Sequence, residues 1–347
     1  MKNVGVKILI AILVIVVIVA GILLGLRLTK NGKNIIQVGE NANVAEDGEK
    51  VVELKEPKIF KGTDRPIAVM IDNHKSEMKQ AGLNDAYMVY EIIVEGGETR
   101  LRALFKGVDL KKVGPVRSSR HYFLDYALEN DAIYVHYGWS PQAQSDITKL
   151  SVNNINGISE SSTSFWRVKD KYAPHNAVTS TEKILAIAKR KGYSTTSTKK
   201  SVLNYVADPV ELEEGVEAKS VTIPYSESNT VKYEYDDTTK RYVRYSRGTK
   251  QVDWDSKETV TVKNIIVVNC KNWTLDDGSG KGRQTIDNIR TLKGYYITNG
   301  KAIAITAEKS SRSGQTIYKD ANGKEIEVND GNTFVQICPE DSKITIE

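Results

Sequence analysis

Residues 8–26 form a run of 19 residues without a charged side chain, flanked by Lys7 and Arg27. An apolar helix of this length is about long enough to cross the hydrocarbon core of a bilayer. A cleavable signal peptide has a shorter apolar region, whereas the apolar residues here continue past Gly21. We therefore predict an uncleaved signal anchor over residues 1–27, a transmembrane helix that makes the chain a single-pass cell membrane protein with its folded part outside the cytoplasm.

The composition of the remaining chain excludes some partners and cofactors. The 347 residues carry a formal net charge of +5, but Lys and Arg are scattered, so nucleic acid is not an expected partner. Residues 28–59 contain no aromatic residue, which predicts a flexible stalk over residues 28–60. Cys270 and Cys338 are the only cysteines in the sequence, so neither a zinc-type spacing nor a lipid-attachment cysteine is present, and we expect no cofactor.

Residues 61–206 contain strand-like and helix-like segments, which predicts a mixed α/β domain. The runs suited to strands cover residues 67–71, 86–94, 100–105 and 132–137. The second and third runs predict a hairpin in which Glu91 and Glu95 face Arg100 or Arg102. Glu91 is notable because an acid within an apolar strand needs a partner.

Three helices are predicted in the same domain. The first follows the Gly114-Pro115 turn and reaches about Glu129. The second begins at Pro141, with Ser140 as its N-cap. The third begins at a capping box formed by residues 179–182 and ends at Gly192.

Residues 207–347 alternate between strands and turns, which predicts a mainly antiparallel β domain. Residues 231–235 and 241–245 alternate strictly and flank a polar turn, as in a hairpin. Asn-Gly pairs at residues 299–300 and 322–323 mark further turns. The sequence is therefore predicted to belong to the α+β class, with an N-terminal mixed α/β domain followed by this β domain.

Two arginines stand on either side of the predicted start of the first helix. Arg117 and Arg120 enclose Ser118 and Ser119, either of which is suited to cap the helix. Cations oppose the positive end of a helix dipole, whereas a bound anion would be stabilised by the arginines, the hydroxyls and the free backbone amides together. The alternative is that the arginines pair with nearby carboxylates and hold the fold together.

Polar residues at the ends of the other predicted elements extend this candidate site. His136 ends a strand, and Asp72 follows one, although an Asx-type turn accounts for Asp72 equally well. We predict that these residues converge on one cleft of the first domain. The predicted ligand-binding residues are Asp72, His74, Glu91, Arg100, Arg117, Ser118, Arg120, His136, His175 and Asn176.

Longer motifs are more specific than single residues. Those in the first domain are Arg65-Pro66 with Met70-Ile71-Asp72-Asn73-His74, Tyr90-Glu91 with Glu95-Gly96-Gly97-Glu98-Thr99-Arg100, Gly114-Pro115-Val116-Arg117-Ser118-Ser119-Arg120, His136-Tyr137-Gly138-Trp139-Ser140-Pro141, and Ala173-Pro174-His175-Asn176. Looser motifs in the second domain are Asn322-Gly323-Lys324-Glu325-Ile326 and Gly331-Asn332-Thr333-Phe334.

These motifs resemble those of the YerB-like family, bacterial cell-surface proteins that are typically lipoproteins of unassigned function. The resemblance covers about residues 60–347 and implies separate N- and C-terminal family regions. This sequence departs from the family by lacking a lipid-attachment cysteine, which leaves the mode of anchoring to the predicted signal anchor. The resemblance implies a location in the cell envelope and assigns no catalytic residue.

Three functions remain open at this point. The first is a binding module for an anionic or cell-wall-derived ligand, in which arginine side chains, with Arg65 and Arg167 added, hold acidic groups while Tyr137, Trp139 and Trp166 stack on sugar rings. The second is an extracytoplasmic hydrolase. The third is a structural or partner-binding protein, in which the motif residues hold two domains together. No protein partner is indicated.

The hydrolase would take one of two forms. In one, His136 or His175 is the base, Ser118 or Ser119 the nucleophile, and Glu91 or Asp72 the orienting acid. No nucleophile motif supports this form. In the other, Asp72, His74, His136 and His175 hold a metal ion, without a recognised ligand spacing, and we therefore expect no metal.

Cys270 and Cys338 each end a predicted strand of the β domain. Two strand-end cysteines outside the membrane favour a disulfide bridge. The alternative is two buried thiols that behave as small apolar residues.

Overall fold

The computed structural model of the chain describes residues 55–347, with residue 77 excepted. The predicted signal anchor at residues 1–27 and the predicted stalk up to residue 54 lie outside the described residues. Within the described part, no helix is both long and apolar enough to cross a membrane. Residues 55–347 form one compact unit by their contacts.

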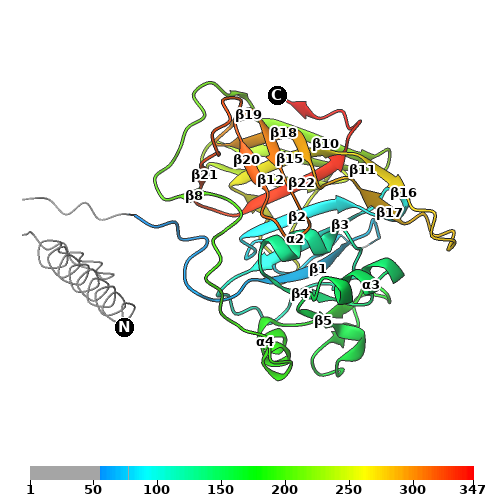
Figure 1. Ribbon diagram of the computed structural model, residues 1–347. Coiled ribbons are helices and arrows are strands. Elements are labelled where there is room, and N and C mark those ends of the chain that lie inside the picture. The colour runs from blue at the N-terminus through cyan, green and yellow to red at the C-terminus, as the bar shows by residue number, and fades with distance from the viewer. Residues whose placement is uncertain (1–54, 77) are drawn as a thin grey trace, which may run out of the picture. The chain divides into compact units, whose positions relative to one another are not determined.

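One mixed sheet organises the described residues and takes strands from both ends of this part of the chain (Figure 1). Its order is β20-β19-β18-β15-β22-β2-β3-β1-β4-β5, with β9 beside β19. At its centre β2 and β22 are parallel, with Met88 opposite Thr333. The strands are β1 (Ile67–Asn73), β2 (Met88–Ile93), β3 (Thr99–Phe105), β4 (Ile133–His136), β5 (Asn154–Asn156), β9 (Val216–Glu217), β15 (Asn264–Cys270), β18 (Thr291–Thr298), β19 (Lys301–Glu308), β20 (Ile317–Lys319) and β22 (Thr333–Pro339).

A second sheet and three two-stranded sheets complete the described strands. The second sheet has the order β13-β12-β11-β10-β23, with β14 beside β12. Its strands are β10 (Ser220–Ser226), β11 (Asn229–Asp236), β12 (Arg241–Ser246), β13 (Thr249–Lys250), β14 (Thr261–Val262) and β23 (Thr345–Ile346). The small sheets pair β6 (Trp166–Arg167) with β7 (Ala177–Val178), β8 (Tyr205–Val206) with β21 (Val328–Asn329), and β16 (Asn272–Thr274) with β17 (Gln284–Ile286).

Three α-helices occur in the described residues: α2 (Phe123–Glu129), α3 (Pro141–Lys149) and α4 (Thr181–Arg190), together with single 3-10 turns at Glu95–Gly97 and Gly157–Ser159. The predicted Ser140 cap is confirmed, because its hydroxyl accepts a hydrogen bond from the Ala143 N–H. Helix α4 is capped by Ser180, one residue after Thr179, the cap of the predicted capping box. Helix α2 begins later than predicted, after Tyr122 and without a side-chain cap, so the prediction of a serine cap is wrong.

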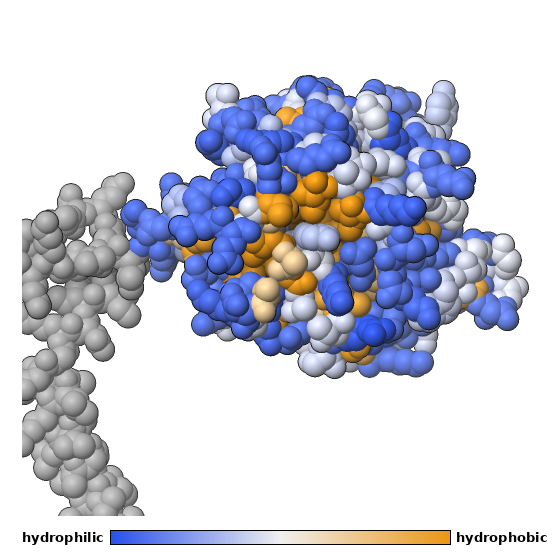
Figure 2. Space-filling view, turned by 90° about the horizontal axis from the view of Figure 1, so that it is seen from above, coloured by the Kyte–Doolittle hydropathy of each residue, from blue (hydrophilic) through white to orange (hydrophobic). Residues whose placement is uncertain are grey.

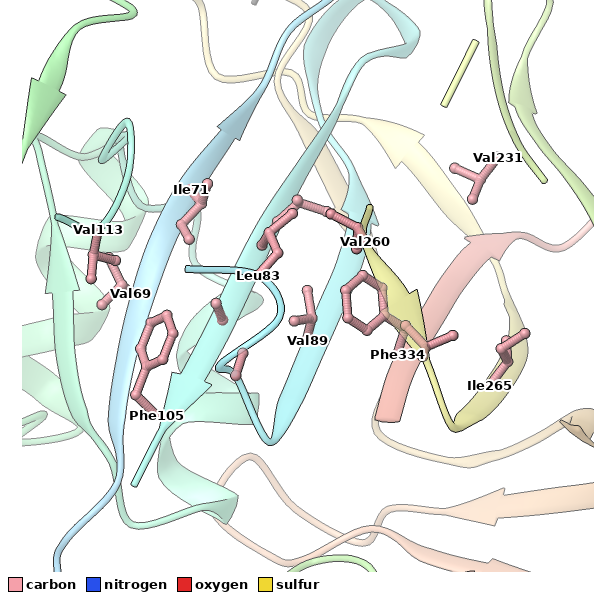
Figure 3. Packing of buried hydrophobic residues seen from close by; sticks show 14 of the residues in the cluster. Val69, Ile71, Leu83, Val89, Phe105, Val113, Val231, Val260, Ile265 and Phe334 are labelled. Atoms are coloured by element: carbon pink, nitrogen blue, oxygen red, sulfur yellow. The ribbon is translucent and has the colours of Figure 1, made fainter. Parts of the chain in front are cut away.

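The main sheet is buried on both faces, which explains why its strands are nearly continuous apolar runs. Helix α4 and the second sheet cover one face, where Val69, Val89 and Phe334 of the main sheet belong to one core cluster with Val231 of β11 (Figure 3). Helices α2 and α3 cover the other face, where Phe123 packs in the second core cluster. Each such fully buried side chain contributes about 1.5–3 kcal/mol to folding.

The surface is not uniformly hydrophilic. On the face that Figure 2 shows, hydrophobic residues gather in a central band bordered by hydrophilic ones. Tyr172, at 89% exposed, and Val216, at 62%, are the most exposed large apolar side chains of the described residues.

The predicted α+β class, with a mixed α/β first domain, is wrong, because the described chain is mainly β. Its α-helices have only 7, 9 and 10 residues. The strands of the first part do not form a sheet of their own, since β2 pairs with β22 from the far end of the sequence. The predicted division of the fold at residues 206 and 207 stays a prediction.

Cys270 and Cys338 are both buried and free, so the expectation of a bridge is wrong. In the pairing of β15 with β22, Cys338 lies opposite Asn269 rather than Cys270. The two side chains therefore point to opposite faces of the main sheet, and each belongs to a different core cluster.

A buried ion pair joins the two large sheets. Glu91 of β2 lies 2.6 Å from a terminal guanidinium nitrogen of Arg244 of β12, and both side chains are fully buried. The other Glu91 oxygen accepts hydrogen bonds from Asn73 and Thr99, at 3.0 and 2.7 Å. Glu91 thus has the partner that its burial requires, but that partner is not Arg100 or Arg102 as the sequence predicts.

We expect Glu91→Ala to lower the free energy of unfolding by about 3–5 kcal/mol, because Arg244 is left buried without its counter-charge. Urea denaturation followed by circular dichroism measures the change. The double variant Glu91→Leu with Arg244→Met should recover most of the loss. Asp287→Ala, which breaks an exposed ion pair with Arg290, is the control and should cost less than about 1 kcal/mol. A Glu91→Ala protein as stable as that control would contradict the role of the pair.

Candidate functional site

The Gly114-Pro115 turn brings the central motif against the end of β1. Gly114 has a φ of 136°, and a Cβ there would lie 2.8 Å from the Val116 nitrogen, so no other residue fits. Beyond the turn, the Arg117 N–H donates to the Met70 carbonyl at 2.9 Å. This pairing puts the Arg117 side chain beside Asp72, the acid near the end of β1.

Asp72 is the centre of a first group of side chains. It is almost fully buried, and its Oδ2 lies 2.5 Å from Nδ1 of His175. Its Oδ1 accepts the backbone N–H of His74 at 3.2 Å and lies 3.4 Å from Nε of Arg117. The rings of His74 and His175 stack with their centroids 4.8 Å apart. Arg117 also donates to the Pro174 carbonyl, which ties it to the loop that carries His175.

A second group adjoins the first through strand pairing. Arg100 lies opposite Asp72 in the pairing of β1 with β3. It donates to the Ser118 carbonyl at 2.7 Å and lies 3.8 Å from Glu95. Glu95 accepts a hydrogen bond from Nε of Arg120 at 2.5 Å. We call the residues of both groups the arginine–histidine cluster: Asp72, His74, Glu95, Arg100, Arg117, Arg120 and His175.

Positive charge exceeds negative charge in this cluster. Three guanidinium groups face two carboxylates. Burial, followed by repulsion from Arg120 and Arg117, lowers the pKa of Arg100 to about 9. Burial acts to raise the pKa of Glu95, but the hydrogen bond and charge of Arg120 outweigh it and lower that pKa overall. The Nε of Arg117 is buried and makes no hydrogen bond to any described residue.

Other predicted site residues hold the fold rather than face a ligand. Both ring nitrogens of the buried His136 are engaged, by the Gly138 carbonyl at 2.8 Å and by Asn154 Oδ1 at 3.2 Å. The Asn176 side chain accepts from Arg167 and donates to two carbonyls of its own loop. Glu91 belongs to the ion pair between the sheets.

The structure therefore brings together Asp72, His74, Arg100, Arg117, Arg120 and His175, with the Ser118 backbone beside Arg100. It holds Glu91, His136 and Asn176 in other networks. Arg65 pairs with Asp131 instead of joining the cluster. The sequence predicted Glu95 as a partner of Arg100 but not as a site residue. The feature that could have identified it is its position next to Gly96 and Gly97 in a turn, where no residue of a neighbouring strand lies opposite.

A small pocket of about 70 Å³ lies beside Arg120. The start of α3, at Ser140, and the loop between β16 and β17, including Arg283, form other parts of its wall. Of the ten predicted residues only Arg120 lines it. The prediction that the site residues surround one cleft thus stays a prediction. Within the described residues, no group of three or more His, Cys, Asp or Glu is arranged to hold a metal ion.

Comparisons with known proteins identify the family. Residues 55–194 match the N-terminal domain, and residues 221–335 the C-terminal domain, of a protein family of unknown function, DUF3048. The chain belongs to this family, which confirms the resemblance seen in its motifs. It is 31% identical over 284 residues to "Putative lipoprotein YerB" of Bacillus subtilis strain 168, covering 80% of this chain and 82% of that protein.

The fold is likewise similar to a solved structure. The crystal structure of the YerB protein from Bacillus subtilis matches with a TM-score of 0.71 and 29% sequence identity. The match covers 84% of this chain and 96% of that one.

The buried histidine of the site region predicts a sensitivity to acid. Burial lowers the pKa of His136 to about 4, although its hydrogen bonds act in the opposite direction. An unfolded chain binds this proton near pH 6.5, so stability is lost as the pH falls from about 7 toward 4. We expect this one group to cost about 2 kcal/mol between pH 7 and pH 5.

Urea denaturation of the wild type and of His136→Gln at both pH values measures the effect. Carboxylates titrate alike in the two proteins, so the difference between their pH slopes isolates His136. The His136→Gln slope should be shallower, and equal slopes would refute the assignment.

Proposed function

We propose that the chain is an extracytoplasmic protein that binds a phosphate- or carboxylate-bearing ligand, such as cell-wall material, at the arginine–histidine cluster. The observation that carries the proposal is the excess of positive charge in the cluster, where Arg100, Arg117 and Arg120 share the two carboxylates of Asp72 and Glu95. The pKa of the buried Arg100 is lowered, and Nε of Arg117 makes no hydrogen bond to the described residues. An added anion would stabilise both guanidinium groups.

Arginine also matches the geometry of these ligands. Its planar fork donates two parallel hydrogen bonds to a carboxylate or a phosphate. Ion pairs to Asp72 and Glu95 hold Arg117 and Arg120 in place, and a site ordered in advance loses little entropy on binding.

An exposed ring adds a surface for a sugar. Trp139 packs on His136 at 5.4 Å between ring centroids, and the Tyr137 ring lies under Arg167 at 5.3 Å. Trp166, the third predicted stacking ring, packs against a small core cluster, so all three predicted rings have neighbours within the fold. Tyr172 is 89% exposed and belongs to the same loop as His175, so it is the ring best suited to contact a saccharide that carries the acidic group.

The proposed location rests on the relative and on the sequence. YerB of Bacillus subtilis is named a putative lipoprotein. The uncharged run at residues 8–26 is long enough to cross a bilayer, so we propose that residues 1–27 hold the chain in the membrane.

Protease treatment of intact protoplasts tests the location. With the full chain produced in Bacillus subtilis, added protease should remove the folded part while a cytoplasmic marker protein survives. Survival of the folded part until the protoplasts are lysed would place it on the other side of the membrane.

Calorimetric titration of the full chain with inorganic phosphate, and separately with glucuronate, tests the binding. At least one of the two should bind, and the preferred one indicates whether the natural ligand carries phosphate or carboxylate. Arg117→Gln should weaken binding about tenfold or more, because a charge-assisted hydrogen bond is lost. Arg190→Gln, which removes an exposed arginine at the end of α4, is the matched control and should bind like the wild type. Absence of binding, or equal binding by the two variants, would overturn the proposal.

A further inference from the structure

We infer that the arginine–histidine cluster also performs phosphoryl transfer, with Nε2 of His175 as the nucleophile that attacks a phosphate monoester. This inference rests on the proposed function, since the arginines that bind the anion would hold the phosphoryl group.

The imidazole of His175 is held in the orientation that such a nucleophile needs. Its Nδ1 lies 2.5 Å from the buried carboxylate of Asp72. A carboxylate accepts hydrogen bonds only, so Nδ1 carries a proton, and in the neutral form of the ring the lone pair lies on Nε2. Nε2 has no hydrogen-bond partner among the residues that the structure describes, and the side chain is 19% exposed.

The groups around this pair fix it from several sides. Oδ1 of Asp72 accepts the N–H of His74 and lies against Arg117, while Oδ2 takes His175. The stacked ring of His74 covers one face of the His175 ring. A nucleophile oriented by a base or acid that is itself held in place is the general arrangement of covalent catalysis.

The neighbouring serines are engaged elsewhere, which leaves the imidazole itself as the nucleophile. The Ser118 hydroxyl donates to the Tyr137 carbonyl at 3.1 Å. The Ser119 hydroxyl accepts from Tyr134 at 2.8 Å and is buried. Neither hydroxyl is hydrogen-bonded to His175 in the described part of the chain.

Arginine is the residue type that a transferring phosphoryl group requires. The three equatorial oxygens of the phosphoryl group share negative charge in the transition state, and guanidinium groups stabilise that charge. Arg117 forms an ion pair with Asp72, which also holds His175. Arg100 is close enough to Arg117 and Arg120 for their charges to contribute to the lowering of its pKa. A carboxylate ligand would bind there without reacting.

The reaction proceeds in two balanced steps. Nε2 of His175 forms a bond to phosphorus, and the bond from phosphorus to the leaving oxygen breaks. The electron pair leaves with that oxygen, which takes a proton from water and yields an alcohol and hydroxide. A water molecule then attacks phosphorus, the electron pair of the N–P bond returns to Nε2, and the proton released by that water neutralises the hydroxide.

Hydrolysis of para-nitrophenyl phosphate by the full chain tests the inference, together with acid-labile, alkali-stable labelling by radioactive acetyl phosphate. The wild type should release nitrophenolate, and mass spectrometry should place the label on His175. His175→Asn keeps an N–H for Asp72 but has no nucleophilic nitrogen, so turnover should fall roughly a thousandfold or more. Its thermal unfolding should stay close to that of the wild type.

Chemical rescue separates catalysis from a structural role. Free imidazole should restore turnover to His175→Gly, since it can occupy the vacated position, and should not change Arg117→Gln. Phosphate binding without turnover or label would overturn this inference and leave the proposed function standing. Turnover with the label on another residue would overturn His175 as the nucleophile.

Discussion

The parallel pairing of β2 with β22 is the contact on which the remaining structure depends. It joins strands from the two family regions into one sheet, and it places Glu91 where it meets Arg244 of the second sheet. The same sheet holds β1 and β3 side by side, so that Asp72 and Arg100 are neighbours. The charged cluster is therefore a product of the sheet topology, since its members come from four separate segments.

Local features of the sequence were sufficient to predict individual elements. The apolar runs at residues 67–71 and 100–105 are strands, and serine caps mark the starts of α3 and α4. The class of the fold was not predictable in this way, because short helices and a pairing between distant strands decide it. Nothing in the spacing of residues shows that β2 selects β22, or that Cys270 and Cys338 face opposite sides of a sheet.

Residue type alone identified more candidate ligand-binding residues than the structure brings into contact. Asp72, Arg117 and His175 meet, whereas Glu91 and His136 have equally polar side chains and are held by partners inside the fold. A buried polar group must be satisfied whether or not it has a function, so its motif alone does not distinguish the two cases. The difference lies in the balance of charge, since three guanidinium groups face two carboxylates in the cluster, and only coordinates reveal which residues meet there.

The place of β22 far beyond β2 in the sequence has a consequence for synthesis. A chain that emerges from its N-terminus exposes one edge of β2 until β22 has appeared. During that interval the unpaired edge of an apolar strand is available to other chains. A product truncated before β22 would keep this exposed edge permanently, which makes it a target for quality-control proteases and chaperones and couples successful folding to the synthesis of this one strand.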